Sequence, residues 1–496
     1  MKTQLLLFGL CFLSVQALYA QENYVIINPG ESEASIIQKA AHVTPIAKQL
    51  RWQQLELTAF FHFGMNTFTG NEWGNGKEDT KLFNPTELDA KQWVKTCKDA
   101  GFKQVIITAK HHDGFCLWPS KYTEHSVKNS PWKNGTGDVV KEVSEACKTY
   151  KIGFGIYLSP WDRNSALYGT EEYNDYFVNQ LTELLTNYGK VDEVWFDGAN
   201  GEGPNGKKQV YDFTRWYGLI RKLQPQAVIA IMGPDVRWVG TETGKGRETE
   251  WSVVPANNLD ANTIADNSQK GLSMKPLGNL TGQDIGSRDK IKNAKALVWY
   301  PAETDVSIRP GWFYHAKEDD KIKTPEQLRD IYYSSVGRNS VLLLNIPPDT
   351  RGLLSDSDVN HLKGFKTLLN ATFSNNLLKN AAIQSPEGKK ITTQITDGKY
   401  TSYWQANDSI VTLDINLKRA ETFSILMLQE NIAIGQRVEK FVLEALVNNE
   451  WTKVTEGTTI GYKRLLRFNA VTAQKVRLRI TASRLNPTIA EMGIYK

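Results

Sequence analysis

The sequence predicts a (β/α)8-like TIM barrel followed by an all-β antiparallel sandwich. Three observations support this fold class. Strand patterns alternate with helical patterns from about residue 50 to 350, which is the element order of a parallel barrel. Several of these strands end abruptly in polar residues, as barrel strands do at the end that carries chemistry. After about residue 375 the helical spacing disappears and short alternating runs take over.

The barrel region repeats a helix followed by a strand. The predicted helices carry apolar residues three or four positions apart, and three of them stop at Gly101, Gly189 or Pro225. An apolar run at Ala59–Gly64 provides the first strand. The helix–strand pairs that follow are 94–100 with Val105–Thr108, 139–150 with Phe154–Leu158, 177–188 with Val191–Phe196, 213–223 with Val228–Met232, and Glu326–Val336 with Val341–Ile346. Trp251–Val254 and Leu297–Tyr300 are the candidates for the remaining strands.

We expect the chain to have three parts. Residues 1–20 read as a secretory signal, with Lys2 before an apolar stretch and a plausible cleavage point after Ala20, so we expect an exported protein, periplasmic or secreted. Cys11 follows the bulky Leu10, which disfavours lipid attachment. Residues 21–365 are expected to form the barrel and residues 366–496 the sandwich. Its predicted strands are Ile410–Ile415, Phe423–Leu428, Lys440–Leu446, Trp451–Glu456 and Lys475–Ile480.

Charge and cysteine content exclude several classes of function. A net charge of +5 over 496 residues, without a long basic run, argues against a nucleic-acid partner. The signal stretch is too short to span a bilayer, and no later segment is long and apolar enough. Cys97, Cys116 and Cys147 do not have metal-ligand spacing. We therefore expect buried thiols and no membrane span.

Asp197 is the strongest candidate for a reacting group. It ends the apolar strand in Val194–Gly198, and a glycine follows it. A strand-end aspartate can instead cap the next helix. Three observations favour chemistry: the residue before Asp197 is apolar, the residue after it is glycine, and neighbouring strands end in polar groups such as His62 and Tyr157. Because barrel strand ends meet at one mouth, these groups are expected to form a site for a sugar.

A retaining glycosidase needs a second carboxyl group that donates a proton. The glycine-rich segment between Trp238 and Trp251 contains three candidates, Glu242, Glu248 and Glu250. The alternative is that two of them pair on the surface with the basic residues Arg237, Lys245 and Arg247. The pattern of residues does not choose the acid among the three.

The segment Lys110-His111-His112-Asp113 raises the question of a metal site. Adjacent histidines are expected on opposite sides of a strand, and no His-x-His or cysteine pair supports them. Imidazoles that bond sugar hydroxyls are therefore favoured over metal ligands. We expect neither a metal nor any other cofactor.

Two aromatic segments are expected beside these groups. Glu72 and Trp73 lie in a loop after the first strand, where an indole face and a carboxylate suit a monosaccharide, although an exposed glutamate is usually only solvated. Arg309–His315 forms a second cluster late in the barrel, in which Trp312 is positioned to pack on the sugar.

At these residues the chain resembles glycoside hydrolase family 29, the retaining α-L-fucosidases. The segments that carry the resemblance run in order through residues 45–350: His62–Gly64, Glu72–Gly74, Lys110–Phe115, Tyr157–Trp161, Trp195–Gly198 and Leu342–Ile346. The resemblance implies Asp197 as nucleophile. It also implies a fucose pocket of His62, Glu72, Trp73, His111, His112, Tyr157 and Trp312. The 238–253 segment is similar to the subfamily that cuts α-1,3 and α-1,4 fucose from Lewis-type glycans. That likeness implies Glu242 as acid/base, with Glu248 or Glu250 bracing the loop or binding the branching galactose.

The resemblance implies an exo-acting retaining α-L-fucosidase whose partners are fucosylated oligosaccharides. Asp-Gly at 397–398 and Trp404 make the sandwich similar to a discoidin-like carbohydrate-binding module. Two alternatives differ from this hypothesis. One is a glycan-binding protein that uses the same pocket with little turnover, and the other is a retaining hydrolase of a related sugar such as L-galactose.

Overall fold

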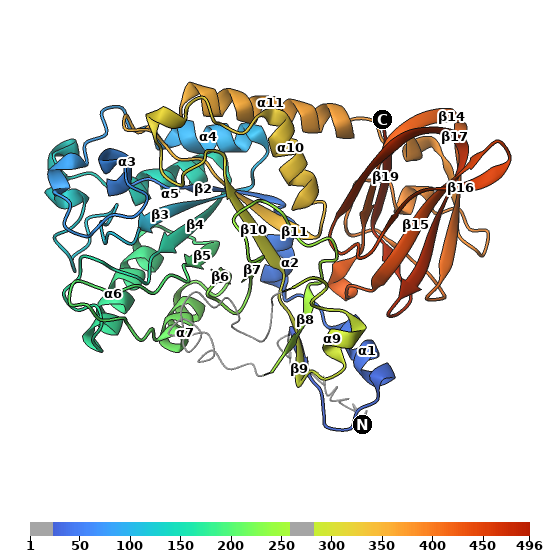
Figure 1. Ribbon diagram of the computed structural model, residues 1–496, viewed down its shortest axis with the longest axis horizontal. Helices are drawn as coiled ribbons and strands as arrows, with labels where there is room; N and C mark the ends of the chain where they lie inside the picture. The colour runs from blue at the N-terminus through green and yellow to red at the C-terminus, as the bar shows by residue number, and fades with distance from the viewer. Residues whose placement is uncertain (1–22, 258–281) are drawn as a thin grey trace, which may run out of the picture.

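The computed structural model describes residues 23–257 and 282–496, which form a barrel and an antiparallel β-domain side by side (Figure 1). The expected signal segment at residues 1–20 lies outside the described residues. Within the described ranges, no helix is both long enough and apolar enough to cross a membrane.

The barrel has eight parallel strands in the order β6-β5-β4-β3-β2-β11-β10-β7. A parallel bridge between Ala230 and Val236 brings β6 and β7 together and nearly closes the ring. This confirms the predicted TIM-like barrel. The strands are β2 (Leu57–Phe61), β3 (Gln104–Lys110), β4 (Gly153–Leu158), β5 (Glu193–Phe196), β6 (Val228–Ile231), β7 (Arg237–Trp238), β10 (Ala302–Ser307) and β11 (Ser340–Asn345).

The assignment of the two weaker barrel strands was wrong. Both segments do correspond to strands, β8 (Val253–Ala256) and β9 (Ala296–Trp299). They lie outside the barrel, in a three-stranded sheet in which β9 pairs antiparallel with β8 and with β1 (Tyr24–Ile26). The barrel uses β7 and β10 in their place. β7 has only two residues, and β10 carries Glu303 and Asp305, so neither has an apolar pattern that could be recognised.

Amphipathic helices cover the barrel, and their ends follow local capping rules. In α4 (Ala90–Ala100), the Asp89 carboxylate accepts from two backbone N–H groups at the start, and Gly101 closes the end in a left-handed conformation. The covering helices α5, α6, α7 and α10 are Val139–Tyr150, Glu172–Asn187, Phe213–Leu223 and Pro325–Ser334. The other α-helices within the described ranges are α1 (Glu33–His42), α2 (Ala47–Gln53), α3 (Met65–Thr69), α9 (Arg288–Ile291) and α11 (Asp356–Phe373).

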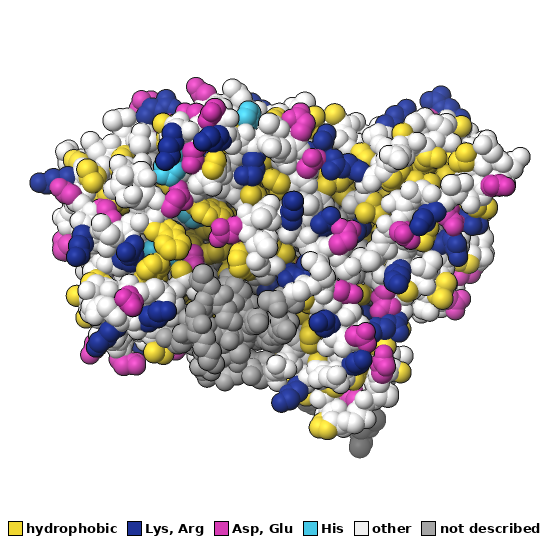
Figure 2. All heavy atoms as spheres, viewed as in Figure 1, with side chains coloured by type: hydrophobic (Ala, Val, Ile, Leu, Met, Phe, Trp, Pro, Cys, Tyr) yellow, Lys and Arg dark blue, Asp and Glu magenta, His cyan; other side chains and the backbone are white. Residues whose placement is uncertain are grey.

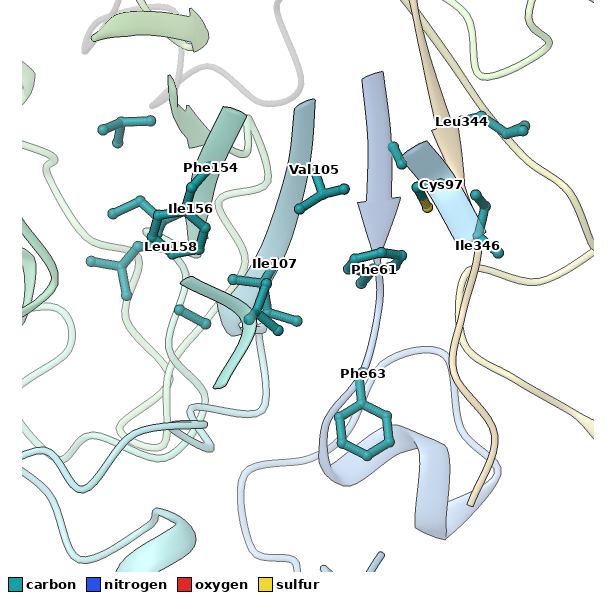
Figure 3. Close-up of a cluster of buried hydrophobic side chains, with 14 of the residues drawn as sticks. Phe61, Phe63, Cys97, Val105, Ile107, Phe154, Ile156, Leu158, Leu344 and Ile346 are labelled. Carbon is teal, nitrogen blue, oxygen red and sulfur yellow. The ribbon is translucent and has the colours of Figure 1, made fainter. Parts of the chain in front are cut away.

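Strand alternation separates two apolar layers. Outward side chains such as Phe61, Ile107 and Leu344 pack beneath the helices, where Cys97 of α4 joins them (Figure 3). The intervening residues, among them Phe60 and Ile106, fill the barrel interior. Because side chains alternate along a strand, each strand contributes to both layers, and its inward series leads to the barrel mouth.

The C-terminal domain has a six-stranded antiparallel sheet and a two-stranded one. Two predicted strands, Ile410–Ile415 and Phe423–Leu428, turn out to be halves of one strand, β14. The exposed residues 418–420 interrupt its alternation, and its register against β17 shifts there. The strands are β12 (Ala382–Gln384), β13 (Trp404–Gln405), β14 (Val411–Gln429), β15 (Val438–Val447), β16 (Glu450–Gly457), β17 (Arg464–Ser483), β18 (Thr488–Ile489) and β19 (Glu491–Tyr495).

The two domains share a continuous apolar contact. The expected boundary at residues 365–366 falls inside α11, which ends at Phe373. The Phe373 ring lies 5.1 Å from that of Tyr495 on β19. Ile425 and Leu465 of the β-domain belong to the same buried cluster as the outer layer of the barrel. The β-domain is therefore packed directly against the barrel.

The barrel interior contains a buried pair of carboxyl groups. Glu193 of β5 accepts from Trp52 Nε1 at 2.9 Å and from Gln104 Nε2 at 2.5 Å. Glu303 of β10 accepts from Trp195 Nε1 at 2.7 Å. Burial raises the pKa of Glu193 to about 7, and burial together with the charge of Glu193 raises that of Glu303 further. Of the two groups, Glu303 is therefore the one that holds its proton more strongly.

Replacing this acid tests the protonation state. The folded protein retains a proton that the unfolded chain releases above its ordinary glutamate pKa, so the free energy of unfolding falls as pH rises toward 7 and beyond. Glu303→Gln keeps the acceptor for Trp195 and removes that proton. We expect the variant to lose a pH dependence of up to about 1.4 kcal/mol per pH unit, measured by urea unfolding between pH 5 and 8. Glu145→Gln, at an exposed position on α5, is the control and should keep the wild-type slope.

Candidate active site

A cavity of about 140 Å³ lies at the carboxyl ends of the barrel strands. The sequence-predicted residues that line it are His62, Glu72, Trp73, His111, His112, Tyr157, Asp197, Glu242 and Trp312. Figure 2 shows hydrophobic, acidic and histidine side chains gathered together on the barrel half of the surface. A larger cavity of about 790 Å³ lies at the opposite strand ends and contains none of these residues.

Asp197 directly follows β5 and continues its inward series. Its Oδ1 accepts from the Ala199 N–H at 2.8 Å, and its Oδ2 accepts from the Tyr157 hydroxyl at 3.1 Å. His112 Nε2 lies 3.8 Å from Oδ2. Helix α7, the next helix, is capped by Asp212, so the helix-cap alternative for Asp197 is excluded. The carboxylate is held by two donors while its side chain remains open to the cavity.

Glu242 reaches the same cavity from the loop that follows β7. The Trp312 indole N–H lies 3.4 Å from its Oε2. Burial raises the pKa of Glu242, and the negative charge of Asp197 raises it further, although the bond from Trp312 opposes the change. A carboxyl group in this setting holds its proton at higher pH than an exposed glutamate does.

The other two glutamates of this loop make ion pairs away from the cavity. Glu248 pairs with Arg338 at 2.6 Å and with Arg464. Glu250 is buried and pairs with Arg237, and Arg247 lies 3.4 Å from it. The surface-pairing alternative was therefore right about two partners, Arg237 and Arg247, but their pair with Glu250 is buried. Glu248 pairs with two other arginines instead.

The histidines are arranged differently from the expectation. His111 and His112 lie on one side, with ring centroids 4.2 Å apart, because they follow the end of β3 and strand alternation no longer applies. The residues on either side of this pair, Lys110 and Asp113, do not line the cavity. Lys110 is fully buried among α6 side chains and pairs with Asp162 at 2.9 Å. Asp113, for which burial raises the pKa to about 7, accepts from a backbone N–H.

Hydrogen bonds assign the proton positions on the histidine rings. The Ser159 hydroxyl donates to the Trp161 carbonyl at 2.6 Å, so it accepts from His112 Nδ1 at 2.7 Å. The Asn345 amide oxygen accepts from His62 Nδ1 at 2.8 Å. Burial lowers the pKa of both rings, to about 3 for His62. The two rings are therefore neutral, and Nε2 of each is an acceptor for a sugar hydroxyl.

His111 has the opposite orientation. The Asn66 side-chain amide approaches its Nδ1 at 3.4 Å as a donor. Burial lowers the pKa of His111 well below its usual value, and the neighbouring histidines add to this effect. Nε2 of His111 is therefore the protonated nitrogen and can donate to a sugar oxygen. The three rings together provide two acceptors and one donor.

Glu72 holds the second aromatic segment in place. Its carboxylate accepts from the Trp312 N–H at 2.8 Å, from the Phe313 N–H at 3.3 Å and from His315 Nε2 at 2.6 Å. Trp73, next to it, has 60% of its surface exposed and meets the His112 ring edge-on. Glu72 thus fixes Trp312 at the cavity wall, and Trp73 leaves an indole free at the entrance.

Further cavity residues were not among the predicted site residues. Asp305 of β10 lines the wall and accepts from Trp238 Nε1 at 2.7 Å, and burial raises its pKa to about 7. Trp195, two residues before Asp197, stacks on Tyr157 with ring centroids 5.3 Å apart. Phe60 and Ala199 complete the wall. The period-two series Glu303, Asp305, Ser307 was the available signal for Asp305, but its polarity concealed the strand.

Comparison with known proteins identifies the family. Residues 47–372 match the family described as Alpha-L-fucosidase, and residues 372–492 match the F5/8 type C domain. The chain belongs to the α-L-fucosidase family of glycoside hydrolases. Alpha-L-fucosidase 1 of Arabidopsis thaliana is 45% identical over 91% of this chain and 87% of its own length.

Solved structures agree over both domains. A crystal structure from Bacteroides ovatus, described as that of a candidate α-L-fucosidase, is 53% identical with a TM-score of 0.85 and covers 95% of this chain and 77% of that one. The Ruminococcus gnavus GH29 fucosidase in complex with fucose is 33% identical with a TM-score of 0.80 and covers 91% of this chain and 95% of that one.

Substitution of Glu72 tests whether its hydrogen bonds to the Trp312 segment are needed for activity. In Glu72→Gln, an amide donor replaces one acceptor oxygen and faces the N–H groups that hold Trp312. We expect kcat/KM for an aryl α-L-fucoside to fall about tenfold or more, since charge-assisted hydrogen bonds are lost. Glu318→Gln is the matched control, because Glu318 accepts one N–H of the same segment, from Gly311 at 3.1 Å, outside the cavity. Equal kcat/KM values for the two variants would contradict the role of Glu72.

Proposed function

We propose that this chain is an exo-acting retaining α-L-fucosidase that removes terminal α-1,3- and α-1,4-linked L-fucose from Lewis-type glycans. One observation carries the proposal: Asp197, directly after β5, and Glu242, on the loop after β7, line one small cavity together with three neutral histidines. Retaining hydrolysis needs such a pair of carboxyl groups, about 5 Å apart when substrate is bound, in two different protonation states.

In the first step, Asp197 attacks the anomeric carbon and Glu242 gives its proton to the departing glycosidic oxygen. The C–O bond to the leaving sugar breaks as the fucosyl–Asp197 ester forms. The hydrogen bonds from Tyr157 and the Ala199 N–H hold the Asp197 carboxylate in position for this attack. The raised pKa of Glu242 favours its protonated form, which this step needs.

In the second step, the Glu242 carboxylate takes a proton from water, and the hydroxide oxygen attacks the anomeric carbon. The ester bond breaks, Asp197 is regenerated, and L-fucose leaves with its original anomeric configuration. The two inversions require that both carboxyl groups act on opposite faces of the same carbon. The chemistry uses only groups that the cavity provides.

The walls support recognition of a single terminal sugar. Nε2 of His62 and His112 accepts from hydroxyls, and Nε2 of His111 donates. Trp312 lies against the cavity with its ring 5.0 Å from that of His62, so its apolar face is available to the C5 methyl side of fucose. The preference for branched substrates rests on the similarity of the 238–253 segment to the Lewis-cleaving subfamily.

Asp197→Asn tests the nucleophile. We expect wild type to release fucose from a Lewis trisaccharide with α-fucose as the first product by NMR, and to leave an α-1,2-linked fucoside largely intact. The variant should lose about 10⁴-fold or more in kcat on the same substrate, because the covalent step is removed. Near-normal turnover by the variant, or β-fucose as the first product, would falsify the mechanism. Faster release of L-galactose from an α-L-galactoside than of L-fucose from the matching α-L-fucoside would contradict the proposed substrate.

Glu242→Gln tests the acid/base. In wild type, kcat/KM for a Lewis trisaccharide should fall as pH rises through the raised pKa of Glu242, because the acid form is lost. The variant should lose this basic limb. It should cleave the trisaccharide at least about 100-fold more slowly but keep kcat/KM for 2,4-dinitrophenyl α-L-fucoside, whose leaving group needs no proton. Added azide should rescue its turnover and give α-fucosyl azide. A wild-type pH profile in the variant would contradict the assignment.

A further inference from the structure

The loop that carries Glu242, residues 239–252, is held by residues of both domains. The first half is attached to the barrel. Gly244 donates its N–H to the Asp305 carbonyl at 3.1 Å, and Gly246 donates to Ser334 of α10 at 2.7 Å. Gly244 has a φ of +72° and packs against Ile331 and Val306, so a side chain there would be strained and crowded.

The second half of the loop is attached to the β-domain in addition to the barrel, in which Arg338 and Arg237 pair with Glu248 and Glu250. Arg464 at the start of β17 donates Nη1 to the Glu248 carbonyl at 2.6 Å, and its Nη2 pairs with the Glu248 carboxylate. Arg464 is only 2% exposed, whereas the Glu248 side chain remains half exposed. Burial lowers the pKa of Arg464, and the charge of Glu248 opposes this effect. A buried guanidinium is thus bound to one residue of the loop.

Neighbouring β-domain residues extend the attachment through the loop backbone. Thr459 Oγ1 accepts from the Glu250 N–H at 3.1 Å, and Gln436 donates to the Glu250 carbonyl at 3.0 Å. The Gln436 side-chain oxygen accepts from the Ser252 N–H at 2.8 Å. The guanidinium of Arg484 lies 3.5 Å from the centre of the Trp251 ring. Residues 248–252 therefore form the contact between the barrel connection and the β-domain.

Glu242 lies two residues before the barrel attachment at Gly244 and only six residues before the β-domain attachment at Glu248. In Figure 1, β8, which follows the loop directly, lies next to the β-domain. Nothing but the 3.4 Å contact from Trp312 holds the Glu242 side chain itself among the described hydrogen bonds. The place of this carboxyl group is therefore set by its backbone. An error of about 1 Å in a catalytic group can reduce the rate by about 100-fold.

We propose that the C-terminal β-domain is part of the catalytic unit, and that Arg464 is a positioning residue which holds the 239–252 loop so that Glu242 reaches the glycosidic oxygen. This inference rests on the proposed role of Glu242. It assigns the domain a part in the reaction in addition to any sugar binding by its own surface. Arg464 acts only through Glu248 and the loop, and touches no cavity residue.

Leaving-group dependence separates a displaced acid from general damage. The measured quantity is the ratio of kcat/KM for a Lewis trisaccharide to kcat/KM for 2,4-dinitrophenyl α-L-fucoside, because only the first substrate needs proton donation. We expect Arg464→Met to lower this ratio about tenfold to a hundredfold. Glu248→Gln, which keeps the shape of the contact and weakens the ion pair, should lower it in the same direction by less. The Glu248→Gln variant also provides the test if Arg464→Met does not fold.

Arg467→Met is the matched control. Arg467 lies on the same strand and also joins the β-domain to the barrel, through Asp330 at 2.7 Å and the Tyr333 ring, but it does not touch the loop. It should keep the wild-type ratio even if the midpoint of urea unfolding falls as much as in Arg464→Met. Equal ratios in both arginine variants and wild type would overturn the inference.

Glu242→Gln, measured in the same experiment, distinguishes a failure of the β-domain's role from a failure of the acid/base assignment. A lowered ratio in Glu242→Gln together with a wild-type ratio in Arg464→Met and Glu248→Gln overturns the role of the β-domain and leaves the proposed function intact. A wild-type ratio in Glu242→Gln itself overturns the acid/base assignment and, with it, the inference.

Discussion

The alternation of side chains along eight parallel strands is the constraint on which this structure depends. Each strand sends every second residue outward to the helices and the others into the barrel, so the inward series of all strands meet at one mouth. Asp197 occupies its position because Glu193 and Trp195 precede it at the same parity on β5. The nucleophile is thus placed by strand geometry and then fixed by two hydrogen bonds.

The same constraint produces a polar barrel interior, with consequences for the site. Glu193 and Glu303 lie at inward positions and share the space beneath Trp195, whose N–H binds Glu303. Trp195 in turn stacks on Tyr157, the donor to Asp197. A chain of contacts therefore links a proton-bearing pair in the core to the floor of the cavity. A purely apolar interior would leave the indole N–H of Trp195 unpaired, which is costly when buried.

The acid/base side of the cavity is built by a different principle. Strand geometry places β7 and β10, but Glu242 lies on a loop, and its backbone is fastened to the barrel at Gly244 and to the β-domain at Glu248 and Glu250. Loops carry few contacts of their own, so a rigid frame must hold them if a reacting group is to stay in place. The two carboxyl groups are thus positioned by separate parts of the fold.

The sequence by itself determined the fold class and six of the barrel strands, because these depend on local periodicity. Through strand ends and the family resemblance it also predicted nine of the residues that line the cavity. It misplaced β8 and β9 and missed β7 and β10, since a two-residue strand and one bearing Glu303 and Asp305 have no apolar pattern. It also set His111 and His112 on opposite sides, because the end of β3 is decided by pairing. The residue pattern left three loop glutamates open, and only the tertiary structure decided which of them faces the cavity. That choice depends on Arg237, which pairs with Glu250, and on Arg338 and Arg464, which pair with Glu248 and are distant from it in sequence.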